Sequence, residues 1–211
     1  GAIAVPINPL YQEREIAKQI DDAGARILIT LDLFSATAQA VMSRSSGSIC
    51  VVGAVSDYLP ALKKMVYPLF KPKGTSAAPR EPGCATVAFR DLMLQQSPPP
   101  TDIAPADIAI LQYTGGTTGT PKAAMLTHRN LSANAHQFAK AINADSSDVF
   151  LVALPLFHIY GLTTSLTTPI SVGAKMVLLP RFTPQNALST IEQQKVSVFC
   201  GVPTMYQLLL A

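Results

Sequence analysis

Residues 108–122 read IAILQYTGGTTGTPK, an apolar run followed directly by a loop of three glycines, four threonines and a lysine. The run Ile108–Tyr113 predicts a buried β-strand. Glycines let a loop turn its N–H groups inward to form a nest for an anion, and threonine hydroxyls add further donors. With the positive charge of Lys122, the loop predicts a cradle for a polyphosphate. An ordinary Gly/Thr turn without a ligand is the alternative.

The loop differs from two common nucleotide-binding motifs. Pro121 stands six residues after Gly115 and no G-K-[ST] occurs, so the loop is not a Walker loop. The sequence contains no G-x-G-x-x-G, which leaves a nicotinamide dinucleotide site unsupported. It also lacks the G-x-S-x-G and H-E-x-x-H patterns, so serine-hydrolase and zinc-protease chemistry has no support.

On both sides of this loop, apolar runs with strand character alternate with stretches of helical spacing. This order predicts an α/β fold class, with parallel or mixed sheets flanked by helices. Before the loop, we expect strands at 2–7, 26–30 and 48–52 and helices beginning near Gln12 and Asp32. After it, we expect strands at 149–154, 174–179 and 196–200 and helices at 128–142, 160–171, 184–194 and from Pro203.

The chain divides into three segments by composition. Residues 1–55 form a βαβαβ segment, and 108–211 hold the Gly/Thr loop and the second run of strands and helices. Between them, 56–107 contains nine of the 17 prolines. Proline removes a backbone donor and interrupts helices and strands. We therefore expect 56–107 to be an elaborated surface connection within one domain, with an interdomain linker as the alternative.

Charged residues are scarce: 16 Lys or Arg and 13 Asp or Glu in 211 residues, or 14%, against about 25% in a typical soluble domain. This composition excludes a disordered, collagenous or coiled-coil chain. The net charge of +3 comes without a clustered basic stripe, which argues against nucleic acid as a partner.

The shortage of charge is concentrated near the C-terminus. Residues 149–211 have so few charges that they resemble the interior of a larger domain. We therefore expect this part of the chain to have an uncovered apolar face and a tendency to aggregate. A stable, dilute monomer would contradict this expectation. The only charged residues in 149–211 are Lys175, Arg181, Glu192 and Lys195.

Residues 149–174 contain no charge and are long enough to cross a bilayer. Prolines and glycines interrupt them, so we interpret them as a buried strand and helix. The three cysteines, Cys50, Cys84 and Cys200, form no C-x-x-C pair and fit free thiols in a reducing compartment. We therefore expect a cytoplasmic protein, with peripheral association with the inner face of the membrane left open.

Three blocks of the sequence resemble signature motifs of the adenylate-forming superfamily, which contains acyl- and aryl-CoA ligases, luciferases and peptide-synthetase adenylation domains. They are LQYTGGTTGTPKAAMLTHRNL (111–131), LPLFHIYG (154–161) and GVPTMY (201–206), and the opening AIAVPINPLY also resembles the family. The flanks of the first block look most like long-chain fatty-acid–CoA ligases. One departure is Ala123, where the family usually has glycine; alanine loses access to positive φ.

The resemblance implies a two-step reaction. A fatty-acid carboxylate attacks the α-phosphate of ATP to give an acyl-adenylate and pyrophosphate, and the thiol of coenzyme A then displaces AMP. Mg²⁺ would share the charge of the phosphates, and it is expected near Thr117 and Thr118. The implied phosphate loop is Thr114, Gly115, Gly116, Thr117, Thr118, Gly119, Thr120 and Lys122.

The second block implies an acyl pocket lined by Phe157, His158, Tyr160 and Gly161. There His158 would orient the carboxylate or close a tunnel, and it is the candidate catalytic residue. A satisfied histidine of the core is the alternative. His128 and His136 are expected at the start and on the surface of a helix, without a role.

Several motifs that the family carries later in its chain do not occur before Ala211: the acidic Mg²⁺ residue, the ribose-binding aspartate, the hinge and the small C-terminal domain with its lysine. The chain is therefore expected to be a segment of the large domain of such an enzyme and inactive alone. One alternative is an aryl-CoA ligase or another adenylate-forming enzyme; the other is a non-catalytic nucleotide- or acyl-binding module. Acyl-chain length and oligomeric state stay open.

Overall fold

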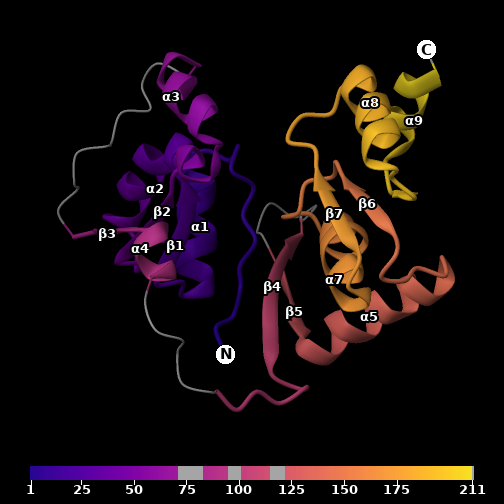
Figure 1. The fold of residues 1–211 in the computed structure, drawn as a ribbon. Coiled ribbons are helices and arrows are strands. Elements are labelled where there is room, and N and C mark those ends of the chain that lie inside the picture. The colour runs from indigo at the N-terminus through magenta and orange to yellow at the C-terminus, as the bar shows by residue number, and fades with distance from the viewer. Residues whose placement is uncertain (71–82, 95–100, 115–121, 211) are drawn as a thin grey trace. The chain divides into compact units, whose positions relative to one another are not determined.

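A computed structural model describes residues 1–70, 83–94, 101–114 and 122–210 (Figure 1). They form two compact units. The N-terminal unit comprises the described residues between Ile7 and Thr101, and the hairpin unit comprises Gly1–Pro6, Asp102–Thr114 and 122–210. Both contain parallel strands flanked by helices, which confirms the expected α/β class.

The N-terminal unit is built on a parallel sheet with the strand order β1-β2-β3. The helix after Gln12 ends at Gly24, whose φ of 59° is the left-handed conformation that glycine adopts without strain. The strands are β1 (Ile27–Leu31), β2 (Ile49–Gly53) and β3 (Ala85–Ala88), and the helices are α1 (Glu13–Ala23), η1 (Asp32–Phe34), α2 (Ser35–Met42), η2 (Val55–Tyr58), α3 (Ala61–Phe70) and α4 (Phe89–Met93).

The strands and helices expected before residue 55 are confirmed within one or two residues for β1, β2 and α1. The stretch expected to be a loop-like connection, by contrast, contains α3, β3 and α4. Pro60 lies directly before α3, where a missing N–H costs no helical bond. Pro68 lies inside α3, so the prolines of this stretch do not exclude a helix.

The core of the N-terminal unit lies between α1, α2 and the sheet. Its two helices contribute apolar residues at helical spacing, and β2 contributes the fully buried Cys50. Burial of such side chains is the main source of stability for a unit of this size. The buried members are Ile16, Ile20, Ala38, Val41, Met42, Cys50 and Cys84.

The hairpin unit begins with two antiparallel strands, β4 (Ile108–Thr114) and β5 (Lys122–Thr127), paired from Ile108↔Thr127 to Thr114↔Lys122. β4 was expected and β5 was not. The strand expected at 2–7 is wrong: only Ala4 forms a bridge, beside Ile110. Pro6 has no N–H to extend that pairing.

A second sheet of this unit has the parallel order β7-β6-β8, with β6 in the centre. Its strands and helices confirm the expected alternation, and Thr183 caps the helix that starts at Pro184 by accepting from the Asn186 N–H at 3.2 Å. The strands are β6 (Val149–Val152), β7 (Lys175–Leu178) and β8 (Val198–Phe199), and the helices are α5 (His128–Ala141), α6 (Ile159–Gly161), α7 (Thr168–Val172), α8 (Pro184–Gln194) and α9 (Pro203–Leu210).

A π-helical segment, η3 (Leu162–Thr167), lies between α6 and α7. The wider π turn leaves carbonyls without their usual i→i+4 donor. Threonine hydroxyls take that place: Thr164 Oγ1 donates to the Tyr160 carbonyl at 2.8 Å, and Thr167 Oγ1 donates to the Thr163 carbonyl at 3.3 Å. The threonine hydroxyls of this segment thus bond to carbonyls one turn earlier, a contact that often accompanies a bend in a helix.

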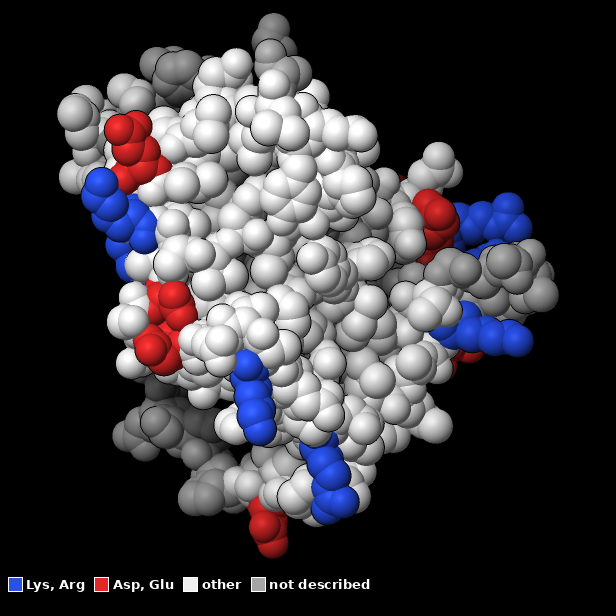
Figure 2. Space-filling model, turned by 90° about the vertical axis from the view of Figure 1, so that its right-hand side faces the viewer, with Lys and Arg blue, Asp and Glu red and all other residues white. Residues whose placement is uncertain are grey.

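The surface that carries α5, α8 and α9 is poor in charge, as expected. Figure 2 shows a broad area of uncharged residues there, with Lys, Arg, Asp and Glu mainly near its margins. Aggregation of the chain stays a prediction. Among the described residues, no helix combines the length and apolar character that crossing a membrane requires. Exposed apolar residues of the C-terminal region include Ile170, Leu178, Leu188, Leu208 and Leu210.

Candidate functional site

The second and third sequence motifs follow the carboxyl ends of two neighbouring parallel strands. The motif 154–161 begins two residues after β6 ends, and the motif 201–206 begins two residues after β8 ends. Because β6 and β8 pair in parallel, both motifs leave the sheet at the same edge. In open α/β sheets this is the edge at which ligands bind.

Side chains from the two motifs meet at this edge. Burial raises the pKa of the Tyr160 hydroxyl, and the nearby Cys200 and Tyr206 raise it further. Burial also raises the pKa of the Cys200 thiol, while a hydrogen bond with Thr164 partly offsets the effect. Tyr206 Oη donates to the Phe199 carbonyl at 3.1 Å and accepts from the Gly201 N–H at 3.0 Å, which fixes the start of the third motif.

His158 stands at the N-cap of α6 and is exposed. Its Nδ1 accepts from the Tyr160 N–H at 3.3 Å. An imidazole that accepts at Nδ1 carries its proton on Nε2, so Nε2–H remains available as a donor. The backbone N–H of His158 donates to the Pro155 carbonyl at 3.1 Å, which holds the turn that presents this ring.

Gly161 has a packing reason to be glycine. A Cβ built on Gly161 would lie 2.3 Å from the Pro155 carbonyl oxygen and 3.2 Å from the Leu154 Cβ. No side chain fits at such a distance without a backbone shift. The glycine therefore allows α6 to pack directly on the turn that carries His158.

The first motif is joined to the second by Gln112, a residue of β4 that is only 7% exposed. Its Nε2 donates to the Phe157 carbonyl at 3.1 Å. Two residues later, Thr114 Oγ1 donates to the Lys122 carbonyl at 3.4 Å, which closes the hairpin at the base of the Gly/Thr loop. The structure thus brings the end of β4 next to the Phe157–His158 turn.

Of the expected phosphate loop, the structure places two residues. Thr114 ends β4 and Lys122 begins β5; both are exposed, and Lys122 has no ion pair with the part of the chain that is described. Residues 115–121, including the candidate Mg²⁺ positions Thr117 and Thr118, lie outside the described residues. The expected pocket residues Phe157, His158, Tyr160 and Gly161 follow one another along the turn after β6.

Sequence reasoning gave no role to three residues that the structure places here: Gln112, Thr164 and Cys200. The signal for Gln112 was present, because a glutamine at an inward-facing position of a buried apolar strand needs a hydrogen-bond partner. Thr164 and Cys200 gave no such signal. Their contact depends on the parallel pairing of β6 and β8.

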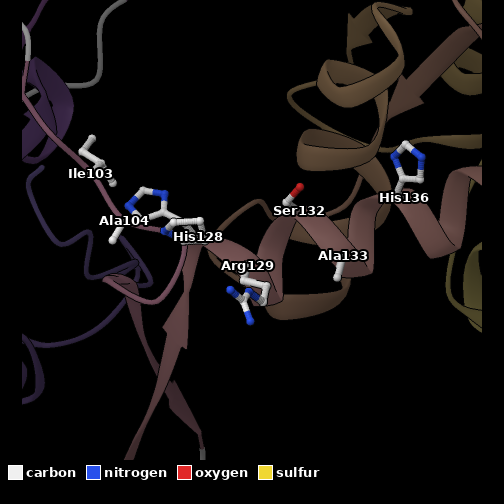
Figure 3. A pocket seen from close by; sticks show the side chains of 8 residues that line it. Ile103, Ala104, His128, Arg129, Ser132, Ala133 and His136 are labelled. Atoms are coloured by element: carbon white, nitrogen blue, oxygen red, sulfur yellow. The ribbon is translucent and has the colours of Figure 1, made fainter.

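A groove of about 560 Å³ lies at the other end of the β4–β5 hairpin, beside the start of α5 (Figure 3). Six residues of β4 separate the Ile108–Thr127 pair at this end from the Thr114–Lys122 pair at the other end. At the usual rise per residue of a β-strand, the two pairs are about 20 Å apart. Arg129, Ser132 and His136, labelled in Figure 3, are spaced at i, i+3 and i+7 along α5 and so share the face that lines the groove. The lining residues are Ile103, Ala104, Pro105, His128, Arg129, Ser132, Ala133 and His136.

The start of α5 offers little to an anion in that groove, because its first three N–H groups are already paired. The N–H of His128 donates to the Asp107 carbonyl at 3.0 Å and that of Arg129 to the Pro105 carbonyl at 2.9 Å. The N–H of Asn130 donates to Thr127 Oγ1 at 3.1 Å. Helix ends bind anions through free N–H groups, so the groove is a weaker candidate than the edge formed by β6 and β8.

No group of three or more His, Cys, Asp or Glu side chains that could hold a metal ion occurs among the described residues. Mg²⁺ in nucleotide sites is often held by the phosphates and only one or two protein ligands. Hydroxyls of the Gly/Thr loop remain candidates for such ligands, at positions outside those described.

A family model described as "AMP-binding enzyme" matches residues 1–211. A long-chain-fatty-acid–CoA ligase of Bacillus subtilis is 38% identical over 212 residues, covering 98% of this chain and 38% of that protein. A 4-coumarate–CoA ligase of Pinus taeda is 33% identical over 207 residues, covering 96% of this chain and 34% of that protein. The chain thus spans less than two fifths of the length of these relatives.

The fold is similar to that of ATP-bound MatB from Rhodopseudomonas palustris, with a TM-score of 0.70 at 24% identity, over 99% of this chain and 36% of that one. At this identity the likeness shows the fold alone. The match of the family model over the whole chain identifies the family. The chain belongs to the AMP-binding enzyme family.

Proposed function

We propose that the protein containing this chain is a fatty-acid–CoA ligase of the AMP-forming type. The observation that carries the proposal is the hydrogen bond from Gln112 to the Phe157 carbonyl, which joins the base of the Gly/Thr loop to the His158 turn. A reaction between ATP and a carboxylate needs a phosphate-binding group and a carboxylate-binding group side by side. The long-chain-fatty-acid–CoA ligases among its relatives support the substrate class.

In this proposal, residues 114–120 and Lys122 hold the β- and γ-phosphates of ATP. The fatty-acid carboxylate oxygen attacks the α-phosphorus, and the bond to the leaving pyrophosphate breaks as negative charge builds on it. The exposed ammonium of Lys122 and the hydroxyl of Thr114 stabilise that charge. Mg²⁺, when bound to the phosphates, supplies further charge neutralisation, with Thr117 and Thr118 as its candidate ligands.

Phe157, His158, Tyr160 and Gly161 form the acyl side of the proposed site. The free Nε2–H of His158 donates to a carboxylate oxygen and orients it for attack. In the second step the thiol sulfur of coenzyme A attacks the acyl carbonyl carbon, and AMP leaves. We propose that residues 1–211 are part of the large domain and that other groups for these steps come from the rest of the protein.

The full-length protein tests the proposal in a reaction with ATP, Mg²⁺, coenzyme A and a C8–C18 series of fatty acids. The expected products are acyl-CoA, AMP and pyrophosphate in equal amounts, with no turnover after EDTA is added. Release of ADP, or binding of ATP without any product, would contradict it; the latter result would favour a non-catalytic binding module.

The 33% identity to a 4-coumarate–CoA ligase gives an aryl-CoA ligase as the second candidate. Both candidates share the adenylation chemistry and differ in the shape of the acyl side. If the full-length protein turns over 4-coumarate faster than every fatty acid of the series, it is an aryl-CoA ligase.

A further inference from the structure

Gln112 is a polar residue at a position that packing alone would fill with an apolar one. Its side chain is 7% exposed, and Ile110, on the same face of β4, is 8% exposed. The side-chain Oε1 is buried and has no hydrogen-bond partner among the described residues. A buried amide with an unpaired oxygen costs free energy that an apolar side chain of similar size avoids. Stability alone therefore does not explain a glutamine at this position.

The shorter hydrogen bond of this side chain runs from Gln112 Nε2 to the Phe157 carbonyl, at 3.1 Å. The two residues are 45 positions apart in the sequence. The other acceptor near Nε2, the Tyr113 carbonyl, is 3.5 Å away. Gln112 lies two residues before Thr114, and Phe157 lies directly before His158. A single amide thus links the residue that opens the Gly/Thr loop to the residue that presents the imidazole.

We propose that Gln112 is a positioning residue, which holds the His158 turn at a fixed place relative to the phosphate loop; this inference rests on the proposed function. Gln112 itself touches neither substrate. Its Nε2–H fixes the position of the Phe157 carbonyl by a hydrogen bond. The peptide bond of that carbonyl leads directly to His158. Without this bond, the turn keeps its own contacts to Pro155 and Tyr160 but loses its tie to β4.

The test is Gln112→Met in the full-length protein, because methionine keeps the length of the side chain and removes the donor. The melting temperature is expected to change little, because the variant removes the unpaired Oε1 but also leaves the Phe157 carbonyl without its donor. The kcat for pyrophosphate release at saturating ATP and fatty acid is expected to fall about three- to tenfold, as for the loss of one hydrogen bond. Gln39→Met is the matched control: Gln39 is 4% exposed with an unpaired Oε1, lies in the N-terminal unit, and its variant is expected to keep kcat.

A double-mutant cycle with His158→Ala distinguishes positioning from a general packing effect. If Gln112 acts through the His158 turn, Gln112→Met lowers kcat less in the His158→Ala background than in the unmodified protein. Equal losses in both backgrounds, or an unchanged kcat in the single variant, would overturn the inference. If the unmodified protein releases no pyrophosphate, the proposed function itself fails, and this inference with it.

Gln112→Glu gives a second measurement if the methionine variant does not fold. A protonated carboxyl group donates to the Phe157 carbonyl, whereas an ionised one repels it. The activity of this variant relative to the unmodified protein is expected to rise as the pH falls from 8 to 6, because a buried carboxyl protonates more readily than an exposed one. A ratio that does not change with pH would overturn the inference.

Discussion

The two ends of the β4–β5 hairpin differ in the pairing of their backbone and buried polar groups. At the end where Ile108 pairs with Thr127, a wide groove holds two histidines and an arginine, yet the first N–H groups of α5 are all paired. Lys122 at one end and Arg129 at the other both have no ion pair with a described residue. At the end where Thr114 pairs with Lys122, however, Gln112 carries a buried oxygen without a hydrogen-bond partner among the described residues. A buried polar atom without a protein partner marks a site better than the size of a groove does.

The sharpest test of this comparison replaces one cation at each end. Lys122→Ala is expected to lower the rate of pyrophosphate release by the full-length protein about 10²–10³-fold, the range seen when one donor to a developing anion is lost. Arg129→Ala, in the groove, is expected to keep the rate of the unmodified protein. A larger loss for Arg129→Ala than for Lys122→Ala would move the site to the groove.

The close packing beside the His158 turn predicts the next largest effect. Gly161→Ala places a Cβ 2.3 Å from the Pro155 carbonyl oxygen, and we expect it to lower the free energy of unfolding by about 3 kcal/mol. Gly53→Ala is the control, since the nearest atoms to its Cβ lie 3.8 Å away, and it is expected to leave the free energy of unfolding unchanged or slightly higher. Urea unfolding measures both. Similar values for the two variants would show that the turn adapts.

At the groove end, Thr127 is expected to matter for stability alone. Its Oγ1 caps α5 by accepting from the Asn130 N–H, so Thr127→Ala should lower the free energy of unfolding by about 1 kcal/mol. Thr127→Ser keeps the hydroxyl and should restore most of that stability. A fall in adenylation rate that exceeds the fall in folded protein would show that this end takes part in the reaction.

The smallest expected effect is a pH dependence at the edge of β6 and β8. Burial raises the pKa of Cys200 above its ordinary value, so the neutral thiol is the form that folding favours. Its contribution to stability is complete below the ordinary pKa of a thiol and is lost as the pH rises through the raised value. Cys200→Ser should therefore lose less stability between pH 7 and pH 10 than the unmodified protein does. Thermal unfolding at each pH measures both proteins. If the two proteins lose the same stability between pH 7 and pH 10, Cys200 is not a buried thiol.

Features set by neighbouring residues were predictable from the sequence. Gly24 as the end of α1 and Thr183–Pro184 as the start of α8 depend only on local backbone preferences. β5 was missed because its short Lys-Ala-Ala-Met segment has little strand preference and is held in place by β4. The strand expected at 2–7 failed because Pro6 has no N–H with which to continue the pairing of Ala4 with β4.

The candidate site was only partly predictable for the same physical reason. His158 and Tyr160 belong to a local motif, which the sequence displays directly. The bond from Gln112 to Phe157 and the proximity of Tyr160 to Cys200 depend on pairings between strands far apart in the chain. Local patterns specify the elements, and the register between them specifies which side chains meet.

The π-helical segment Leu162–Thr167 makes the length of this part of the chain as important as its composition. A π turn contains one residue more than the α turn that spans the same helix length. Deletion of one residue there would convert the segment to an α-helix and rotate the preceding residues about 100° around its axis relative to α7. Tyr160 would then turn away from Cys200. A single-residue deletion, with no change in the residue types on either side, is thus a route by which a relative with this fold can present different side chains at the edge of β6 and β8.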